Sequence, residues 1–142
     1  MEISVHDNTL HSYCVSANKK EICIHTSYAS PTSQQFSDII FTGVVAYRFE
    51  LDNFMTIISD VYETHVETIY TDNQDLFEHG RKYCWPGRWN SSDESVLTYL
   101  IENEVKGYQL TSAIGMIGWV LAKSMSLVNS TVHQFAAPDA NR

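Results

Sequence analysis

Histidine is the first side chain to examine for chemistry, because a neutral imidazole can bind a metal or act as a general base near pH 7. None of the histidines lies in the His-Glu-x-x-His or His-x-His spacing that holds a metal. His65 and Glu67 match half of a zinc-deaminase signature, but the Pro-Cys-x-x-Cys half is missing. His6 and Asp7 are adjacent, and adjacent residues on a strand point to opposite faces. The sequence therefore predicts no metal, no cofactor and no catalytic residue.

The cysteines Cys14, Cys23 and Cys84 form no Cys-x-x-Cys pair. An odd number without paired spacing is typical of reduced thiols in a cytoplasm rather than of a disulfide framework or a zinc site. One alternative stays open: if Asn18-Lys19 is a two-residue hairpin turn, Cys14 lies directly opposite Cys23, and oxidation could join them. Cys84 has no base at a recognisable spacing, which favours a structural thiol over a nucleophile.

The negative charge of the chain is concentrated in one segment. Residues 49–80 hold eight of the 17 acidic residues and no Lys or Arg, so this segment accounts for the whole net charge of −8. Such a segment attracts a basic partner and speeds its association. A solvated face that aids solubility is the simpler interpretation and stays open. The acids are Glu50, Asp52, Asp60, Glu63, Glu67, Asp72, Asp75 and Glu78.

The length and composition predict a single folded domain. A chain of 142 residues with 44% hydrophobic and 18% charged residues can bury one core. We expect the domain to span residues 1–135 and residues 136–142 to form a flexible tail. The acidic balance disfavours nucleic acid as a partner. The sequence shows no secretory signal and no apolar run long enough to cross a bilayer, so we expect a cytoplasmic protein without a membrane partner.

Short runs of Val, Ile, Phe and Tyr predict that most of the first half is β-structure. Residues 10–17 and 21–28 flank a turn and predict a hairpin. Gly43 interrupts the next run and predicts two strands or one bent strand. The remaining strand candidates are residues 36–49, 55–61, 108–113 and 116–125.

Two helices are predicted between these strands. Apolar residues at helical spacing place one helix at about residues 65–82, with Thr64 and Glu67 as a capping box. Ser91 and Glu94 form a second capping-box pair before a helix at about residues 92–104. The sequence thus predicts an α+β fold, a mostly antiparallel sheet with both helices packed on one side.

The tryptophans divide into two groups. Trp119 alternates with apolar neighbours, which favours a place in the core. Trp85 and Trp89 lie between the two predicted helices, where exposed aromatic residues often anchor a partner.

Six short segments spread over most of the chain carry a resemblance to a known family, although none contains a catalytic signature. These segments are residues 6–10, 41–44, 58–61, 77–86, 106–113 and 118–122. They resemble small bacterial immunity proteins of contact-dependent or polymorphic toxin systems, together with their uncharacterised relatives. The resemblance implies a non-enzymatic cytoplasmic protein that binds its cognate toxin domain and blocks the active site or a surface beside it.

We therefore expect a protein that neutralises a basic toxin domain, with the acidic segment steering the encounter and tryptophans prolonging the complex. The alternative is a small ligand-binding domain or enzyme whose pocket lies between the sheet and the helices. The expected partner-binding residues are Glu50, Asp52, Glu63, Glu67, Asp72, Asp75, Glu78, Trp85 and Trp89.

Overall fold

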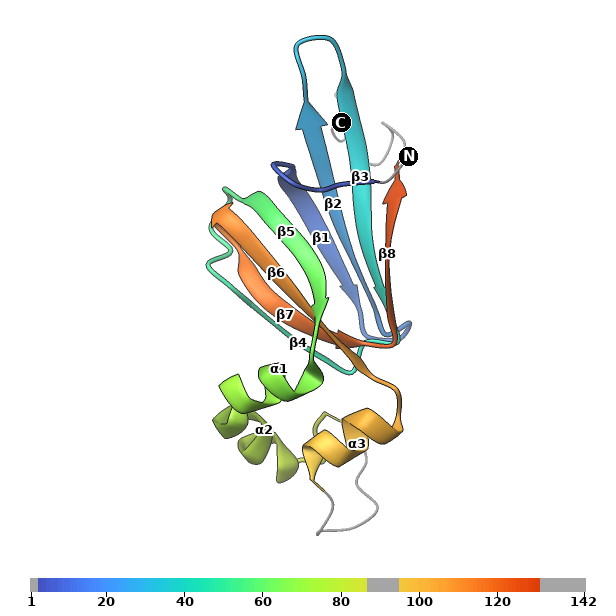
Figure 1. Ribbon diagram of the computed structural model, residues 1–142, viewed down its shortest axis with the longest axis vertical. Coiled ribbons are helices and arrows are strands. Elements are labelled where there is room, and N and C mark those ends of the chain that lie inside the picture. The colour runs from blue at the N-terminus through green and yellow to red at the C-terminus, as the bar shows by residue number, and fades with distance from the viewer. Residues whose placement is uncertain (1–2, 87–94, 131–142) are drawn as a thin grey trace, which may run out of the picture.

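The computed structural model describes residues 3–86 and 95–130, and its main element is an eight-stranded antiparallel sheet (Figure 1). The strands lie in the order β4-β7-β6-β5-β1-β2-β3-β8. The chain order of the elements is β1 (Thr9–Ser16), β2 (Glu21–Ala29), β3 (Gln34–Thr42), β4 (Ala46–Glu50), β5 (Ile57–Thr64), α1 (Val66–Asp72), α2 (Gln74–Arg81), α3 (Val96–Glu102), β6 (Lys106–Ile114), β7 (Ile117–Ala122) and β8 (Ser124–Asn129).

The predicted α+β class with two helices is wrong, because the described residues form a mostly β protein with three short helices. The predicted helix at 65–82 is divided at Asn73, whose φ of −129° is not helical. The Asn73 side chain donates a hydrogen bond to the Ile69 carbonyl and so competes with the regular helical pattern. None of the described helices is long and apolar enough to span a bilayer.

The predicted helix starts are also corrected. Thr64 is the last residue of β5, and α1 begins at Val66, one residue after the predicted start at 65. His65 is the N-cap of α1, and its side chain makes no capping hydrogen bond. The N-cap of α3 is Ser95, whose hydroxyl accepts a hydrogen bond from the Thr98 amide. The expected cap at Ser91 and Glu94 falls outside the described residues, as does the predicted tail.

The strand predictions agree more closely with the structure than the helix predictions do. The first hairpin is confirmed, and its register places Cys14 directly opposite Cys23. The break at Gly43 is confirmed as well, since this residue has a φ of +63° between β3 and β4. The single run predicted for 116–125 is wrong, because the chain turns at Lys123. The Lys123 amide donates to the carbonyls of Thr42 and Gly43, and β8 then pairs with β3 instead of continuing β7.

The sheet folds on itself where β1 meets β5, because the two strands share only the Thr9–Ile57 pair. The halves β4-β7-β6-β5 and β1-β2-β3-β8 enclose the first core, in which Phe41 of β3 contacts Tyr108 of β6. Most of the other buried members are aliphatic, namely Val5, Ile22, Ile24, Ile39, Ile58, Val61, Leu110, Met116, Val120 and Ala122.

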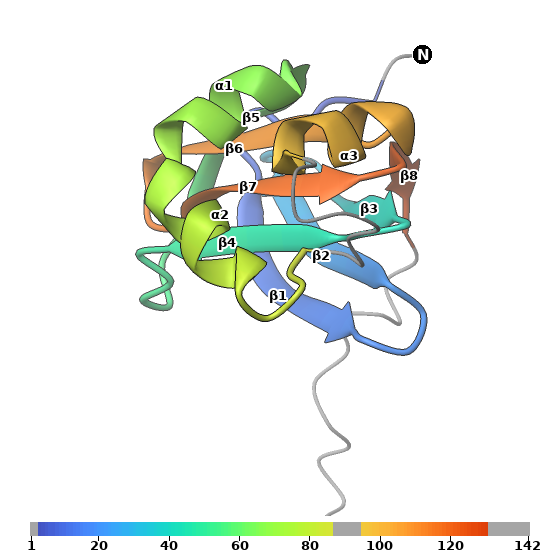
Figure 2. The ribbon, with the colours of Figure 1, turned by 90° about the horizontal axis from the view of Figure 1, so that it is seen from below.

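A second core lies on the other face of β7, under the helices, which gather at one end of the molecule (Figures 1 and 2). Trp119 and Leu121 of β7 face this core, whereas Val120 and Ala122 face the first one. The expected core position of Trp119 is therefore confirmed. Helix residues that complete the second core include Val66, Ile69, Phe77, Val96 and Leu100.

Candidate functional site

Helices α1 and α2 carry four exposed carboxylates, Glu67, Asp72, Asp75 and Glu78. The buried residues of these helices, such as Ile69 and Phe77, face the second core, so the acids point to solvent. Within the part of the chain that the structure describes, none of the four pairs with a cation. We call this set the acidic helical surface.

The other predicted acids have partners or lie elsewhere. Glu63, at the end of β5, is 3.8 Å from the Lys106 ammonium. Glu50 pairs with Arg48 at 2.8 Å, and Asp52 accepts a 2.7 Å hydrogen bond from the Tyr13 hydroxyl.

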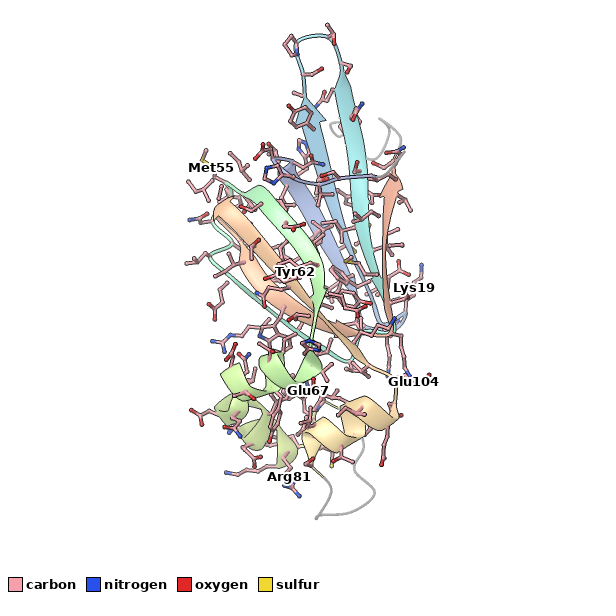
Figure 3. The ribbon with its side chains drawn as sticks, viewed as in Figure 1. Lys19, Met55, Tyr62, Glu67, Arg81 and Glu104 are labelled. Carbon is pink, nitrogen blue, oxygen red and sulfur yellow. The ribbon has the colours of Figure 1, made fainter. Side chains whose placement is uncertain are left out.

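Asp52 lies in the loop between β4 and β5 that also holds Met55, and Figure 3 shows Met55 at the opposite end of β5 from Glu67. An eight-residue strand spans about 25 Å. The structure therefore separates Glu50 and Asp52 from the acidic helical surface.

Of the two expected aromatic anchors, the described residues include Trp85. Trp85 is half-buried and stacks on Phe77, with ring centres 5.4 Å apart. Its ring also covers Gly80, where a Cβ atom would come within 2.3 Å of it. Trp85 thus closes the second core, and Trp89 lies outside the described residues.

The loop between β4 and β5 exposes apolar side chains that the sequence analysis did not single out. Leu51 is 63% exposed, Met55 is 58% exposed, and Phe54 is fully exposed. Leu51 and Phe54 have φ values of 61° and 71°, an unfavourable region for side-chain-bearing residues. The predicted strands 36–49 and 55–61 leave Leu51 and Phe54 between them, but include Met55, which the structure places in the exposed loop.

A hollow of about 370 Å³ lies between the β1–β2 turn, the start of β4 and the segment after α2. Among the described residues, none of α1, α2 or α3 lines it, so its position differs from the pocket between sheet and helices that the alternative function expects. Its lining includes Val15, Lys20, Glu21, Tyr47, Trp85 and Pro86.

The first three strands bring together a cysteine, a histidine and a carboxylate. Cys23 and His25 alternate with the core residues Ile22 and Ile24, so both lie on the outer face of β2. Asp38 lies directly opposite His25 on β3, and its carboxylate is 2.9 Å from the His25 Nδ1 atom. The Cys23 Sγ atom is 3.8 Å from the same nitrogen.

This cluster could be found from the sequence only with the strand register. Cys23-x-His25 is a spacing that puts both side chains on one face of a strand. Asp38 is thirteen residues beyond His25, and only the β2–β3 pairing brings the two together.

Two pKa shifts are resolved among the histidines and cysteines of the described residues. Burial, reinforced by the negative charge of Asp38, raises the pKa of the Cys23 thiol to about 11, so it is a poor nucleophile at neutral pH. The exposed His6 donates a hydrogen bond to the Ser59 carbonyl, and this bond together with Asp7 raises its pKa above 6.5.

Comparisons with protein-family models, with curated proteins and with solved structures give no match to this chain.

Proposed function

We propose that this protein is a non-enzymatic binding protein that holds a basic protein domain against the acidic helical surface. The observation that carries the proposal is the set of four exposed carboxylates without a cation partner in the described part of the chain. Like charges held together on one surface repel each other, and a basic partner relieves that repulsion.

The resemblance to immunity proteins suggests which basic partner is meant. Toxin domains that cut nucleic acid carry positive charge near their active sites, because they bind phosphates. A protein that covers such a site with carboxylates would block the substrate and protect the producing cell. We therefore propose a cognate toxin domain as the partner and a cytoplasmic place of action.

In this proposal Trp85 has a smaller part in binding than the sequence analysis gave it. Since Trp85 stacks on Phe77, it holds α2 in place and offers only part of its ring to a partner. Steering by charge is then the main contribution of the helices, and it acts on the association rate more than on the lifetime of the complex.

The test starts with capture of partners from native lysate at low salt, elution by salt, and identification of the eluted chains. Association rates are then measured for a variant with Glu67→Lys, Asp72→Lys, Asp75→Lys and Glu78→Lys. At low salt we expect the association rate to fall about tenfold or more. We also expect this rate to depend much less on salt concentration. Asp60→Lys with Glu102→Lys, two exposed acids outside this surface, is the control. Equal rates for both variants would contradict the proposal.

A further variant, Phe54→Ser, separates this proposal from binding through the exposed loop at the other end of β5. The acidic helical surface predicts an unchanged association rate for this variant. A loss of binding confined to Phe54→Ser would place the interface at the loop.

The second candidate function is binding of a small ligand in the hollow beside Trp85, which the 370 Å³ volume and the mixed lining favour. Lys20 and Glu21 would give such a ligand polar contacts, and Val15, Tyr47 and Trp85 would give it apolar ones. A small-molecule screen by thermal shift tests it, with Tyr47→Ala expected to abolish any stabilisation.

A further inference from the structure

The outer face of β2 and β3 gathers three potential metal ligands from two paired strands. One ligand atom from each of Cys23, His25 and Asp38 lies within 4.8 Å of the others. Asp38 is only 3% exposed, although it lies on the face of the sheet turned away from the first core. A buried carboxylate needs compensation of its charge, and His25 supplies part of it through the 2.9 Å contact between its Nδ1 atom and the Asp38 carboxylate.

The observed distances are close to those in a tetrahedral zinc site. Typical bond lengths of about 2.3 Å to sulfur and 2.0 Å to nitrogen or oxygen place neighbouring ligand atoms about 3.3–3.6 Å apart. The measured separations are 3.8 Å from Cys23 Sγ to His25 Nδ1 and 2.9 Å from that nitrogen to Asp38 Oδ1. Side-chain shifts of a few tenths of an ångström to about one ångström bring all three atoms to coordination distance.

Cys14 lies across the first hairpin from this cluster, although it is not one of the residues whose ligand atoms lie within 4.8 Å of one another. Cys14 of β1 is the direct partner of Cys23, and paired residues project from the same face of a sheet. Cys14 is exposed and Cys23 is half-buried, so the group is open to solvent on the β1 side.

We propose that Cys23, His25 and Asp38 form a binding site for a divalent transition metal, with Cys14 as the fourth ligand and Zn²⁺ as the preferred ion. Thiolate and imidazole ligands exclude Mg²⁺ and Ca²⁺, which prefer oxygen. Two thiolates, one imidazole and one carboxylate make a four-coordinate set without an open position, which is the arrangement of a structural site. When Zn²⁺ binds, each thiol loses its proton to solvent and the sulfur donates its electron pair to the metal.

The proposed site would have a structural consequence for the sheet. It would join β1, β2 and β3 on their outer face, on the side opposite the first core. Bound metal then adds to the stability of this half of the sheet, because it binds the folded chain far better than the unfolded one.

The experiment uses the whole chain with any affinity tag removed, reduced and stripped of metal with a chelator. Zn²⁺ binding is measured by titration calorimetry, and Co²⁺ serves as a spectroscopic probe. We expect one equivalent of Zn²⁺, a rise in melting temperature, and a Co²⁺ spectrum with tetrahedral ligand-field bands and thiolate-to-metal charge transfer.

Single substitutions separate the ligands from other groups. Cys23→Ser is expected to remove the charge-transfer band in large part and to weaken Zn²⁺ binding at least about tenfold. Asp38→Asn should weaken binding similarly, and Cys14→Ser should keep binding with a weaker charge-transfer band. Cys84→Ser is the matched control, because Cys84 is an exposed cysteine after α2, outside this cluster.

Two results would overturn the proposal. One is a folded wild-type protein that takes up no Zn²⁺ and shows no change in melting temperature. The other is uptake that Cys23→Ser leaves unchanged, which would place the metal elsewhere. If Asp38→Asn fails to fold, Cys23→Ser decides the question, since the half-buried Cys23 tolerates the smaller hydroxyl.

Discussion

The two hydrophobic cores on either side of β7 draw their side chains from different elements. Both are mainly aliphatic, but the first joins the two halves of the sheet, whereas the second joins β7 to the helices around a row of rings in which Phe77 contacts Trp85 and Trp119. The helices over the second core have seven or eight residues each, too short to be stable by themselves. We infer that ring packing holds the helical end in place, and strand pairing with distributed packing holds the sheet.

The same contrast is present on the surface. On the outer face of β2 and β3, polar groups such as His25 and Asp38 are paired with each other. On α1 and α2, the four carboxylates face solvent. The first arrangement suits a small ion and the second suits a large partner, so the two proposals concern different surfaces of the molecule.

The strongest test of this comparison uses two buried phenylalanines, Phe77 in the second core and Phe41 in the first. Each substitution to Ala should lower the free energy of unfolding by about 3–5 kcal/mol. Phe77→Ala should also release the helical end before the sheet, so tryptophan fluorescence changes at a lower urea concentration than the circular dichroism of the strands. Phe41→Ala should keep the two transitions together. Coincident transitions in Phe77→Ala would show that both cores unfold as one unit.

A smaller effect is expected where Trp85 rests on Gly80. Gly80→Ala puts a Cβ atom within 2.3 Å of the indole ring, which must move. We expect a loss of about 1–3 kcal/mol in unfolding free energy, partly offset by the better helix propensity of Ala. In a Trp85→Ala background the same change should no longer destabilise, and chemical denaturation of the four proteins gives the coupling energy. Additive effects would mean that Trp85 does not rest on Gly80 in solution.

On the sheet side, the Tyr13 hydroxyl donates to Asp52, and this hydrogen bond is the main reason why the pKa of Tyr13 is raised above 10. Tyr13→Phe should cost less than about 1 kcal/mol, because the bond is exposed. Ultraviolet titration should show one high-titrating tyrosine fewer. Tyr108→Phe is a useful reference, since burial raises the pKa of Tyr108. An unchanged titration curve in Tyr13→Phe would argue against the hydrogen bond.

The smallest expected effect concerns His6. Its pKa is raised in the folded chain by the hydrogen bond to Ser59 and by Asp7, so protonated His6 favours the folded state. This contribution is complete below pH 6.5 and is lost as the pH rises through the raised pKa. In His6→Gln, the melting temperature should therefore change slightly less with pH over this range than it does in the wild type. NMR titration of the imidazole checks the direction, and a pKa at or below 6.5 would contradict it.

Local patterns predicted much of the sheet but little of how its parts meet. The first hairpin and the break at Gly43 follow from turn residues and alternation, both of which are local. The turn at Lys123 depends on hydrogen bonds with Thr42 and Gly43, which are far away in the chain, so a period in the sequence does not show it. The division at Asn73 rests on a local side-chain hydrogen bond to the Ile69 carbonyl, which the apolar spacing does not show either. β7 is apolar at nearly every position because both its faces are buried, so its end could not be located from alternation.

For the candidate sites as well, residues close together in the chain were found from the sequence, and residues brought together by strand pairing were not. The acidic segment is visible in the sequence because its residues are close together in the chain, although the structure divides it along β5. The cluster of Cys23, His25 and Asp38 was missed because His25 and Asp38 meet only through the pairing of β2 and β3.

The pairing of β3 with β8 sets an order of events during synthesis. β3 ends at Thr42, whereas its outer partner begins at Ser124, so more than half of the chain must be made between them. Until then, β3 is an open edge that carries Ile39, Ile40 and Phe41, a run prone to join other chains. We expect the nascent protein to need protection by a chaperone over this interval, and truncation before β8 to cause aggregation.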